Sequence, residues 1–379
     1  MQVGIFCDSF LPENKAVAVR MFHVATAFHE MGSQTSVHCS TRGVSSTTFS
    51  IKPNFFKAPD NTSGTVSRLL SEILLGLELF LKVLFCKYSL VVISSPPFFT
   101  SCMVATAAIW KKIPIVFDVR DEYPEVYFSA GLVSSKGLLG KALLWVESWI
   151  YRNALLTATV TEGIVERIGQ KQPKAKIELL RNGFDETLFI PSKSKEEIFT
   201  VVFHGNIGKF QRPDLILELA YLAQKKSLPI QFRVIGWGNN DEVLKQDTPS
   251  NLIFQGMVDY DLISTLIGRA HIGISFRSTD TISVNSFPVK LYEYIGVGVP
   301  MLVVPKSEAG DLITKRMFGY QFSGDNAGEI LNKIVELMEN PWLMQQLTRN
   351  VLNARSEFSR QVICRNFVEK LQNDLAYYE

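Results

Sequence analysis

The sequence has almost no excess of one charge sign, and it is poor in cysteine and histidine. Its 39 Lys and Arg residues nearly cancel its 37 Asp and Glu residues, so neither a nucleic acid nor another acidic polymer is the expected partner. The five cysteines are scattered and form no C-x-x-C pair, which argues for a reducing compartment and against a structural zinc site. The five histidines show no metal-ligand spacing.

Several functional signatures are also missing from the sequence. The first eight residues lack the basic start and the long apolar stretch of a signal peptide, and they predict a strand instead. Low-complexity tracts and short-period repeats are absent. The chain offers no Ser–His–Asp set and no D-x-D at the end of a predicted strand for a metal-bound diphosphate. We therefore expect neither a metal nor a cofactor.

One strongly apolar segment, Leu69–Cys86, contains Glu72, Glu78 and Lys82. Charges inside a bilayer are costly, and the segment is barely long enough to span one. It predicts an amphipathic helix with a wide apolar arc. Packing against a sheet is the main expectation, and lying on a membrane surface is the functional alternative.

At 379 residues, the chain is too long for one ordinary core and predicts two domains. Short apolar runs alternate with helical patterns, which predicts parallel sheets covered on both faces. The pattern stops at the polar segment Pro191–Glu197, the predicted linker, and then restarts. Such folds bind ligands at the carboxyl ends of their strands. The predicted strands are 3–7, 34–39, 90–94, 113–119, 155–160, 178–180, 200–204, 230–235, 252–255, 271–275 and 301–304.

The stretch Asn285–Pro300 predicts a loop, a short helix and the approach to a buried strand. Pro288 suits the first position of the helix, and Lys290 and Glu293 are expected toward its exposed N-terminal end. A helix N-terminus with such side chains is a natural seat for a phosphate. The alternative is a surface Lys290–Glu293 pair that contributes only about 0.2–0.5 kcal/mol.

A second candidate is Phe203–Gly208, in which two glycines just after an apolar strand let the backbone approach a ligand. Lys209 and Arg212 follow at the start of a predicted helix. Phosphoryl oxygens are bound by fixed donors and full positive charge, and this loop offers both. A solvated basic helix start is the alternative. A dinucleotide site is not expected, because Asp241 replaces the third glycine of the fingerprint in Val234–Asp241.

In the first half, Pro114–Glu125 ends a predicted buried strand with a dense polar cluster. Buried parallel strands rarely end this way unless they open into a site. Arg120 cannot accept a proton, so any general-base role here falls to Asp121. The alternative is a structural pair between Arg120 and a neighbouring Asp.

These segments resemble a known family. Asn285–Pro300 resembles the nucleotide-sugar-binding motif of family 4 (group 1) GT-B glycosyltransferases, in the variant P-S-K-L-x-E-Y-x-x-x-G-x-P. Pro114–Glu125 and the turn Ser95–Pro97 resemble segments of a bacterial surface-polysaccharide subgroup. The resemblance implies an α/β fold of two doubly wound Rossmann-like domains that face each other across a cleft. It implies an acceptor domain (1–190), a nucleotide-sugar domain (191–360) and a last helix (361–379) that crosses back to the first domain.

The resemblance also assigns roles to residues of the second half. Glu293 would hold the ribose hydroxyls of the donor nucleotide, whereas Asn285 replaces a second Glu that many members use for the donor sugar. Either Lys209 or Arg212 would steady the departing diphosphate. The implied donor site consists of Gly205, Asn206, Gly208, Lys209, Arg212, Val258, Lys290, Leu291 and Glu293.

In the first half, the resemblance places Asp121 and Arg120 on the acceptor side, near the reacting carbon. Arg20 stands where members often carry an Arg, but Asn14–Ala18 replaces the glycine-rich loop expected before it. An acceptor-phosphate role for Arg20 is therefore not part of the prediction.

The resemblance implies a retaining glycosyltransferase that transfers a sugar from a UDP-linked donor to a polyprenyl-linked or growing surface-polysaccharide acceptor. A lipid-linked acceptor fits the apolar segment Leu69–Cys86 and the nearby Trp110–Lys112. We therefore expect a cytoplasmic protein, peripheral at the inner face of the cytoplasmic membrane. The alternatives are a nucleotide-sugar epimerase on the same fold and an inactive nucleotide-sugar-binding protein.

Overall fold

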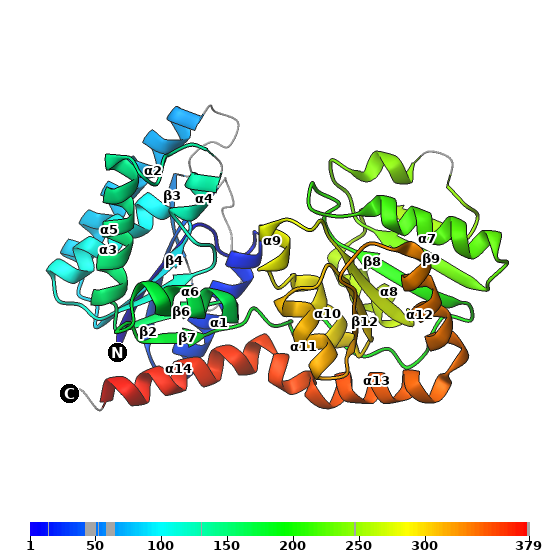
Figure 1. Cartoon of the computed structure of the whole chain (residues 1–379). Coiled ribbons are helices and arrows are strands. Elements are labelled where there is room, and N and C mark those ends of the chain that lie inside the picture. The colour runs from blue at the N-terminus through cyan, green and yellow to red at the C-terminus, as the bar shows by residue number, and fades with distance from the viewer. Residues whose placement is uncertain are drawn as a thin grey trace. The chain divides into compact units, whose positions relative to one another are not determined.

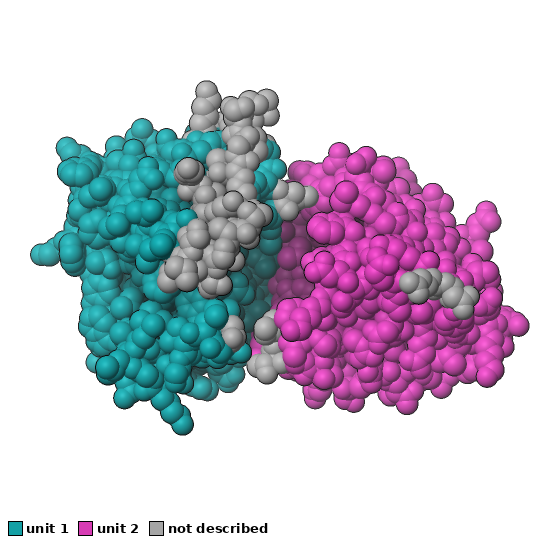
Figure 2. Space-filling model, turned by 90° about the horizontal axis from the view of Figure 1, so that it is seen from above, with its two compact units in different colours: residues 1–182, 363–379 teal, residues 183–362 magenta. Residues whose placement is uncertain are grey.

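The computed structural model of the chain describes residues 1–13, 15–41, 51, 53–57, 65–129, 131–245 and 248–376. The chain forms two compact units, which Figure 2 distinguishes by colour. Unit 1 consists of Met1–Asn182 with Ile363–Glu379, and unit 2 consists of Gly183–Val362. Unit 2 thus begins before the segment that the sequence predicts as the linker. Asn14 lies outside the described residues.

Unit 1 is built on a parallel sheet, whose described strands run in the order β3-β2-β1-β4-β5-β6-β7. Both faces of the sheet are buried, since Ile5 packs into the core on one face and Phe6 into the core on the other. The strands are β1 (Gln2–Cys7), β2 (Gln34–Thr41), β3 (Asn54–Lys57), β4 (Leu90–Ser95), β5 (Ile115–Val119), β6 (Leu156–Thr159) and β7 (Ile177–Leu179).

Helices cover both faces of this sheet (Figure 1). Helices α1 and α14 contribute to the core on one face, and α2, α3, α5 and α6 contribute to the core on the other. The predicted amphipathic segment belongs to α2, and α14 begins in unit 2 and continues in unit 1. The helices are α1 (Ala16–Glu30), α2 (Thr65–Phe85), α3 (Phe98–Trp110), α4 (Glu125–Ser129), α5 (Leu138–Asn153), α6 (Glu162–Lys171) and α14 (Arg360–Ala376).

Unit 2 repeats this design with described strands in the order β10-β9-β8-β11-β12-β13, all parallel. Phe203 of β8 packs into one core, with residues of α7 and α12, and Val202 packs into the other, with α10. The predicted α/β fold of two doubly wound domains is confirmed.

The strands of unit 2 are β8 (Phe199–His204), β9 (Ile230–Ile235), β10 (Leu252–Gly256), β11 (Ile272–Phe276), β12 (Met301–Val304) and β13 (Gly319–Gln321). The helices are α7 (Pro213–Lys225), η1 (Asp241–Leu244), α8 (Tyr260–Gly268), α9 (Thr281–Val284), α10 (Val289–Val297), α11 (Glu308–Lys315), α12 (Ala327–Glu339), α13 (Pro341–Ala354) and η2 (Arg355–Phe358).

Helix α10 differs from its prediction in two respects. Pro288 is the N-cap residue, with extended backbone angles (φ −60°, ψ 136°), so the helix begins one residue later. Lys290 and Glu293 are only 8% and 7% exposed, because every residue from 290 to 297 of this helix is buried. The interpretation of these two residues as a surface pair is therefore wrong. The helix ends at Val297, and Gly298 caps it with a left-handed φ of 73°.

Candidate active site

Glu293 is a buried carboxyl in the middle of α10. The Tyr260 hydroxyl donates a hydrogen bond to Glu293 Oε1 at 3.3 Å. His204, at the end of β8, places its Nε2 atom 3.3 Å from Glu293 Oε2, but the angles do not make a hydrogen bond. Burial lowers the pKa of His204 to about 3, so the imidazole is neutral near pH 7 and this contact is not an ion pair. A carboxylate has lone pairs for several donors, so Glu293 can accept further hydrogen bonds from a ligand.

Near neutral pH, the Glu293 carboxyl is part protonated and part ionised. Burial raises the pKa of Glu293 to about 7, although the charges of Arg360 and Lys290 and the hydrogen bond from Tyr260 lower it. Arg360 is buried as well and donates from Nη2 to the carbonyl oxygen of Gly183 at 2.8 Å. Buried carboxyls with a shifted pKa are enriched at functional sites. Ligand groups that donate hydrogen bonds to the carboxylate would favour its ionised form.

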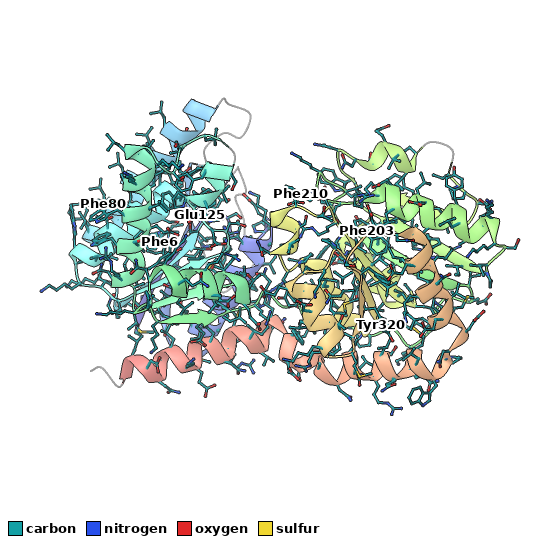
Figure 3. The ribbon with its side chains drawn as sticks, in the orientation of Figure 1. Phe6, Phe80, Glu125, Phe203, Phe210 and Tyr320 are labelled. Carbon is teal, nitrogen blue, oxygen red and sulfur yellow. The ribbon has the colours of Figure 1, made fainter. Side chains whose placement is uncertain are left out.

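Lys290 places a second ionisable group in the interior of unit 2. Its Nζ atom lies 3.5 Å from the ring centroid of Phe203, which Figure 3 labels, and it donates a hydrogen bond to Gln211 Oε1 at 3.3 Å. Burial lowers the pKa of Lys290 well below its ordinary value, and the charge of Arg277 lowers it further, while Glu293 opposes the shift. A bound anion would raise the pKa of Lys290 again and would favour its charged form. The Lys290 ammonium is therefore suited to bind a negatively charged group.

The loop between β8 and α7 brings its backbone close to Lys290. Gly205 has a φ of 109°, and a Cβ atom at this position would lie 3.7 Å from Lys290 Cε. Gly236, in the turn after β9, packs directly on this loop. A Cβ atom at Gly236 would lie 1.9 Å from the Gly205 carbonyl oxygen, so the turn supports the loop that carries Asn206 and Gly208.

The structure distinguishes Arg212 from Lys209, which the sequence leaves as equal candidates. Arg212 Nη2 lies 2.6 Å from Asp214 Oδ2, and its Nη1 lies 2.5 Å from Asp325 Oδ2. Two carboxylates therefore already balance the charge of Arg212. Lys209 is exposed in the loop before α7, where its ammonium is accessible to a ligand.

Arg277 is a cation of this region that the sequence analysis missed. It directly follows β11, and its Nη1 donates a hydrogen bond to Ser286 Oγ. Burial lowers the pKa of the Arg277 guanidinium, while the charge of Asp280 opposes the shift. The sequence could have indicated Arg277, because it directly follows an apolar strand and ligands of such folds bind at the carboxyl ends of strands.

Two of the predicted donor-site residues are part of the apolar packing around α10. The Leu291 side chain is 0% exposed, so it contributes to a site by holding the helix in place. Val258 is half-buried in the turn between β10 and α8, where it packs against the same core. Asn285, which replaces the second Glu of many family members, is half-buried between α9 and α10.

In unit 1, the carboxyl end of β5 carries a buried ion pair. Arg20 Nη2 lies 2.7 Å from Asp118 Oδ1, and their side chains are 1% and 2% exposed. Arg20 Nε donates to Asp118 Oδ2 at 3.2 Å, and Ser94 Oγ donates to the same oxygen at 3.0 Å. The side chain of Arg20 is therefore fixed within the fold of unit 1.

Arg120 and Asp121 lie directly after this strand. Arg120 Nε donates to Ser94 Oγ at 3.0 Å, and its Nη2 donates to the Pro96 carbonyl oxygen at 2.9 Å. Burial lowers the pKa of the Arg120 guanidinium, and the charges of Asp118 and Asp121 oppose this shift. Asp121 is exposed. A fixed guanidinium and an accessible carboxylate thus occur together at the end of this strand.

Comparison with known proteins identifies two family matches. Residues 184–354 match the family described as "Glycosyl transferases group 1". Residues 67–183 match the family described as "Glycosyl transferase 4-like domain". The first match lies in unit 2 and nearly all of the second in unit 1.

The chain also resembles individual proteins at low identity. The UDP-N-acetylglucosamine--N-acetylmuramyl-(pentapeptide) pyrophosphoryl-undecaprenol N-acetylglucosamine transferase of Rickettsia akari (strain Hartford) is 20% identical over 263 residues, which cover 66% of this chain and 62% of that protein. The chain thus spans less than two thirds of this relative. The sucrose-phosphate synthase from Thermosynechococcus elongatus has a TM-score of 0.69 at 12% identity, over 100% of both chains. Anabaena Alr3699/HepE in complex with UDP also has a TM-score of 0.69, at 14% identity, over 98% of this chain and 100% of that chain.

At these identities, the solved structures establish a shared fold only. The family matches adjoin each other and together run from residue 67 to residue 354. Together with the two parallel sheets, they support a group 1 glycosyltransferase of the GT-B fold.

Proposed function

We propose that this enzyme transfers a sugar, with retention of its anomeric configuration, from a UDP-linked donor to a hydroxyl of a lipid-linked or growing surface-polysaccharide acceptor. One observation carries the proposal: unit 2 combines the buried carboxyl of Glu293 with the cations Lys209, Arg277 and Lys290 at the carboxyl ends of its strands. The names of the Rickettsia transferase and of the Anabaena complex support UDP as the nucleotide.

In this proposal, Glu293 binds the two ribose hydroxyls of the nucleotide. Adjacent hydroxyls can each donate a hydrogen bond to one carboxylate, and hydrogen bonds to a charged group are stronger than neutral ones. Burial of Glu293 removes the competition from water. Tyr260 holds the carboxyl in position from the neighbouring helix α8.

The diphosphate is assigned to Lys209, Arg277 and Lys290. Arg212 is not assigned to it, because it would have to leave Asp214 and Asp325. The N-terminus of α10 adds the positive end of the helix dipole. We propose that these groups, without a metal ion, stabilise the charge that develops on the leaving diphosphate.

The acceptor reacts at unit 1 residues in this proposal. The bond between the anomeric carbon and the diphosphate oxygen breaks, and a bond between that carbon and the acceptor oxygen forms. The acceptor hydroxyl gives its proton to the carboxylate of Asp121. Arg120 is held by Ser94 and Pro96, so it can orient the acceptor but cannot take the proton.

The outer face of α2 supports a lipid-linked acceptor and a position at the inner face of the cytoplasmic membrane. One stripe of this helix is buried in the core, and a second apolar stripe is exposed by 46% to 83%. Among the described residues, no helix has the length and apolar character that crossing a membrane requires. A helix with an exposed apolar stripe and nearby lysines suits the membrane interface. The exposed stripe consists of Leu70, Leu74, Leu77, Leu81 and Phe85.

We expect the double substitution Leu74→Glu with Leu81→Glu to weaken binding to vesicles at least tenfold. Each of these leucines is at least 50% exposed, so the fold should tolerate the change, whereas a buried charge opposes insertion into lipid. Co-sedimentation with vesicles that contain anionic lipid measures the effect. Trp342→Glu, on the exposed face of α13 in unit 2, is the control and should bind as the wild type does. Equal binding of the double variant and the wild type would contradict a membrane role for α2.

The donor assignment predicts different effects for two neighbouring cations. Lys209→Ala should lower the rate of UDP-sugar turnover about 10- to 100-fold, because a charge-assisted hydrogen bond contributes about 1.5–3 kcal/mol. Arg212→Ala should lower it less than about threefold, since Arg212 is already paired. Initial rates of UDP release measure both effects. A larger loss in Arg212→Ala would reverse the assignment.

The reaction class itself is tested with purified protein and a panel of UDP-sugars. We expect UDP to raise the melting temperature by mass action and a UDP-sugar to release UDP slowly in water and faster with a polyprenyl-phosphate acceptor. Conversion of one UDP-sugar into another would instead indicate an epimerase. Binding without turnover under either condition would indicate a nucleotide-sugar-binding protein.

A further inference from the structure

Unit 1 contains a cavity of 550 Å³, which lies within the range of roughly 300–1,000 Å³ that is typical of small-molecule sites. It is formed where the turn after β4 meets the start of α3, the segment around α4 and the start of α5. All of its lining residues belong to unit 1. The donor site proposed above uses none of them, so the cavity needs a separate explanation.

Aromatic rings form much of the cavity lining. Phe98 stacks on Tyr123, with ring centroids 6.1 Å apart, and Phe99 stacks on Tyr127, with centroids 6.0 Å apart. The two tyrosine rings contact each other edge to face at 4.9 Å. The faces of such rings bind apolar groups well. Leu139, a lining residue that is 60% exposed, gives the cavity an apolar rim that is open to solvent.

The charges around the cavity disfavour an anionic occupant. Two carboxylates, Asp8 and Glu72, belong to the lining, and the described lining includes no lysine or arginine. Glu72 Oε1 accepts a hydrogen bond from the Phe99 N–H at 2.8 Å, so a carboxylate already occupies the N-terminus of α3. A phosphate or a fatty-acid carboxylate would meet like charge here. A neutral apolar group is the chemistry that fits.

One end of the cavity adjoins the proposed acceptor residues. Pro96 belongs to the lining, and its carbonyl oxygen accepts a hydrogen bond from Arg120 Nη2 at 2.9 Å. Asp8, at the end of β1, is close enough for its charge to raise the pKa of Arg120. The apolar cavity therefore runs up to the polar groups that we assign to the acceptor.

We propose that this cavity binds the isoprenoid chain of the acceptor, with the phosphate-bearing end of the chain outside the cavity and directed toward Arg120. The inference rests on the proposed function. The methyl branches and double bonds of an isoprenoid pack on ring faces, whereas a saturated acyl chain offers methylene groups only. The acceptor named for the Rickettsia relative carries an undecaprenol chain, which is the same chemical class.

The test compares two adjacent positions of α5. Leu139 lines the cavity, whereas Leu138, which is 89% exposed, does not. In the full-length protein, Leu139→Trp should fill the mouth of the cavity and raise the Kd of radiolabelled geranylgeraniol at least about tenfold. Leu138→Trp adds the same side chain outside the cavity and should change the Kd less than about twofold. Rapid gel filtration of protein with the labelled alcohol measures the Kd, and unlabelled hexadecanol should compete at least tenfold more weakly than geranylgeraniol.

Equal Kd values for the two variants would overturn the inference, and so would hexadecanol competing as well as geranylgeraniol. The rise in melting temperature with UDP is recorded for every protein. A Leu139→Trp variant whose circular dichroism and urea unfolding match those of the wild type keeps unit 1 folded, so its loss of isoprenoid binding reports on the cavity. Wild-type protein that responds to UDP but does not bind geranylgeraniol would refute this inference alone. Wild-type protein that does not respond to UDP would refute the proposed function.

Discussion

Substitution of Glu293 by Ala is expected to lower kcat/KM for the UDP-sugar by about 100- to 10,000-fold. In the proposed site, the substitution removes the carboxylate that accepts two ribose hydroxyls, and hydrogen bonds to a charged group contribute about 1.5–3 kcal/mol each. The loss is expected in kcat/KM because this interaction forms when the donor binds. Initial rates of UDP release over a range of UDP-sugar concentrations measure it. Glu339→Ala, an exposed glutamate at the end of α12, is the control and should behave as the wild type.

The same residue predicts two opposite pH effects. Burial raises the pKa of Glu293 from 4.5 to about 7. Between these values the folded protein binds a proton that the unfolded chain has lost, so this residue makes the protein less stable as the pH rises from 4.5 to about 7. Glu147 of unit 1, whose pKa burial also raises to about 7, acts in the same direction.

Donor binding should improve over the pH range in which Glu293 ionises, since the ribose hydroxyls bind the carboxylate best. We therefore expect kcat/KM to rise as the pH increases from about 6 to about 8. Glu293→Gln cannot ionise and should remove this rise. A pH profile that is unchanged in Glu293→Gln, or activity of Glu293→Ala within a few-fold of the wild type, would exclude Glu293 from the donor site.

Asp118→Ala is expected to destabilise unit 1 by about 3–5 kcal/mol, because it leaves the buried charge of Arg20 without its partner. Both side chains are almost fully buried, at 1% and 2% exposed. The substitution also removes the acceptor of the Ser94 hydroxyl. Urea unfolding, followed by circular dichroism, measures the change in the free energy of unfolding.

Two control variants distinguish the loss of the Arg20–Asp118 ion pair from a general effect of replacing an aspartate. Asp374→Ala breaks the exposed Lys176–Asp374 pair of the same unit and should have far less effect. A double variant, Arg20→Met with Asp118→Leu, removes both buried charges and should recover most of the lost stability. If Asp118→Ala is as stable as the wild type, this pair does not fix the Arg20 side chain. Arg20 would then be available to bind the acceptor.

Most of the strands could be predicted because each is a short apolar run between turn residues. Two strands were not predicted. Strand β13, Gly319–Gln321, has only three residues, and β3, Asn54–Lys57, has polar residues at both ends. Neither provides a run long enough for a periodicity argument. The sequence also predicts a helix at 239–246, whereas the described part of this segment contains a short 3-10 helix, Asp241–Leu244.

The sequence proposes residues for the candidate site, but it does not show which of their charges are already paired. The motif around Glu293 indicated a nucleotide site, whereas its burial depends on the packing around all sides of α10. Arg212 is matched by Asp325, which is 113 residues away in sequence. Arg20 is matched by Asp118, which is 98 residues away. Partners so distant along the chain leave no local pattern, so only the folded structure shows which cations are already paired.

The central claim is that unit 2 binds the nucleotide through Glu293, with the diphosphate on Lys209, Arg277 and Lys290. A crystal structure of the protein with UDP tests this claim most directly. We predict both ribose hydroxyl oxygens within about 3.2 Å of the Glu293 carboxylate, and diphosphate oxygens within the same distance of at least two of the three cations. A nucleotide bound elsewhere in the chain, or one whose ribose is turned away from Glu293, would contradict the claim.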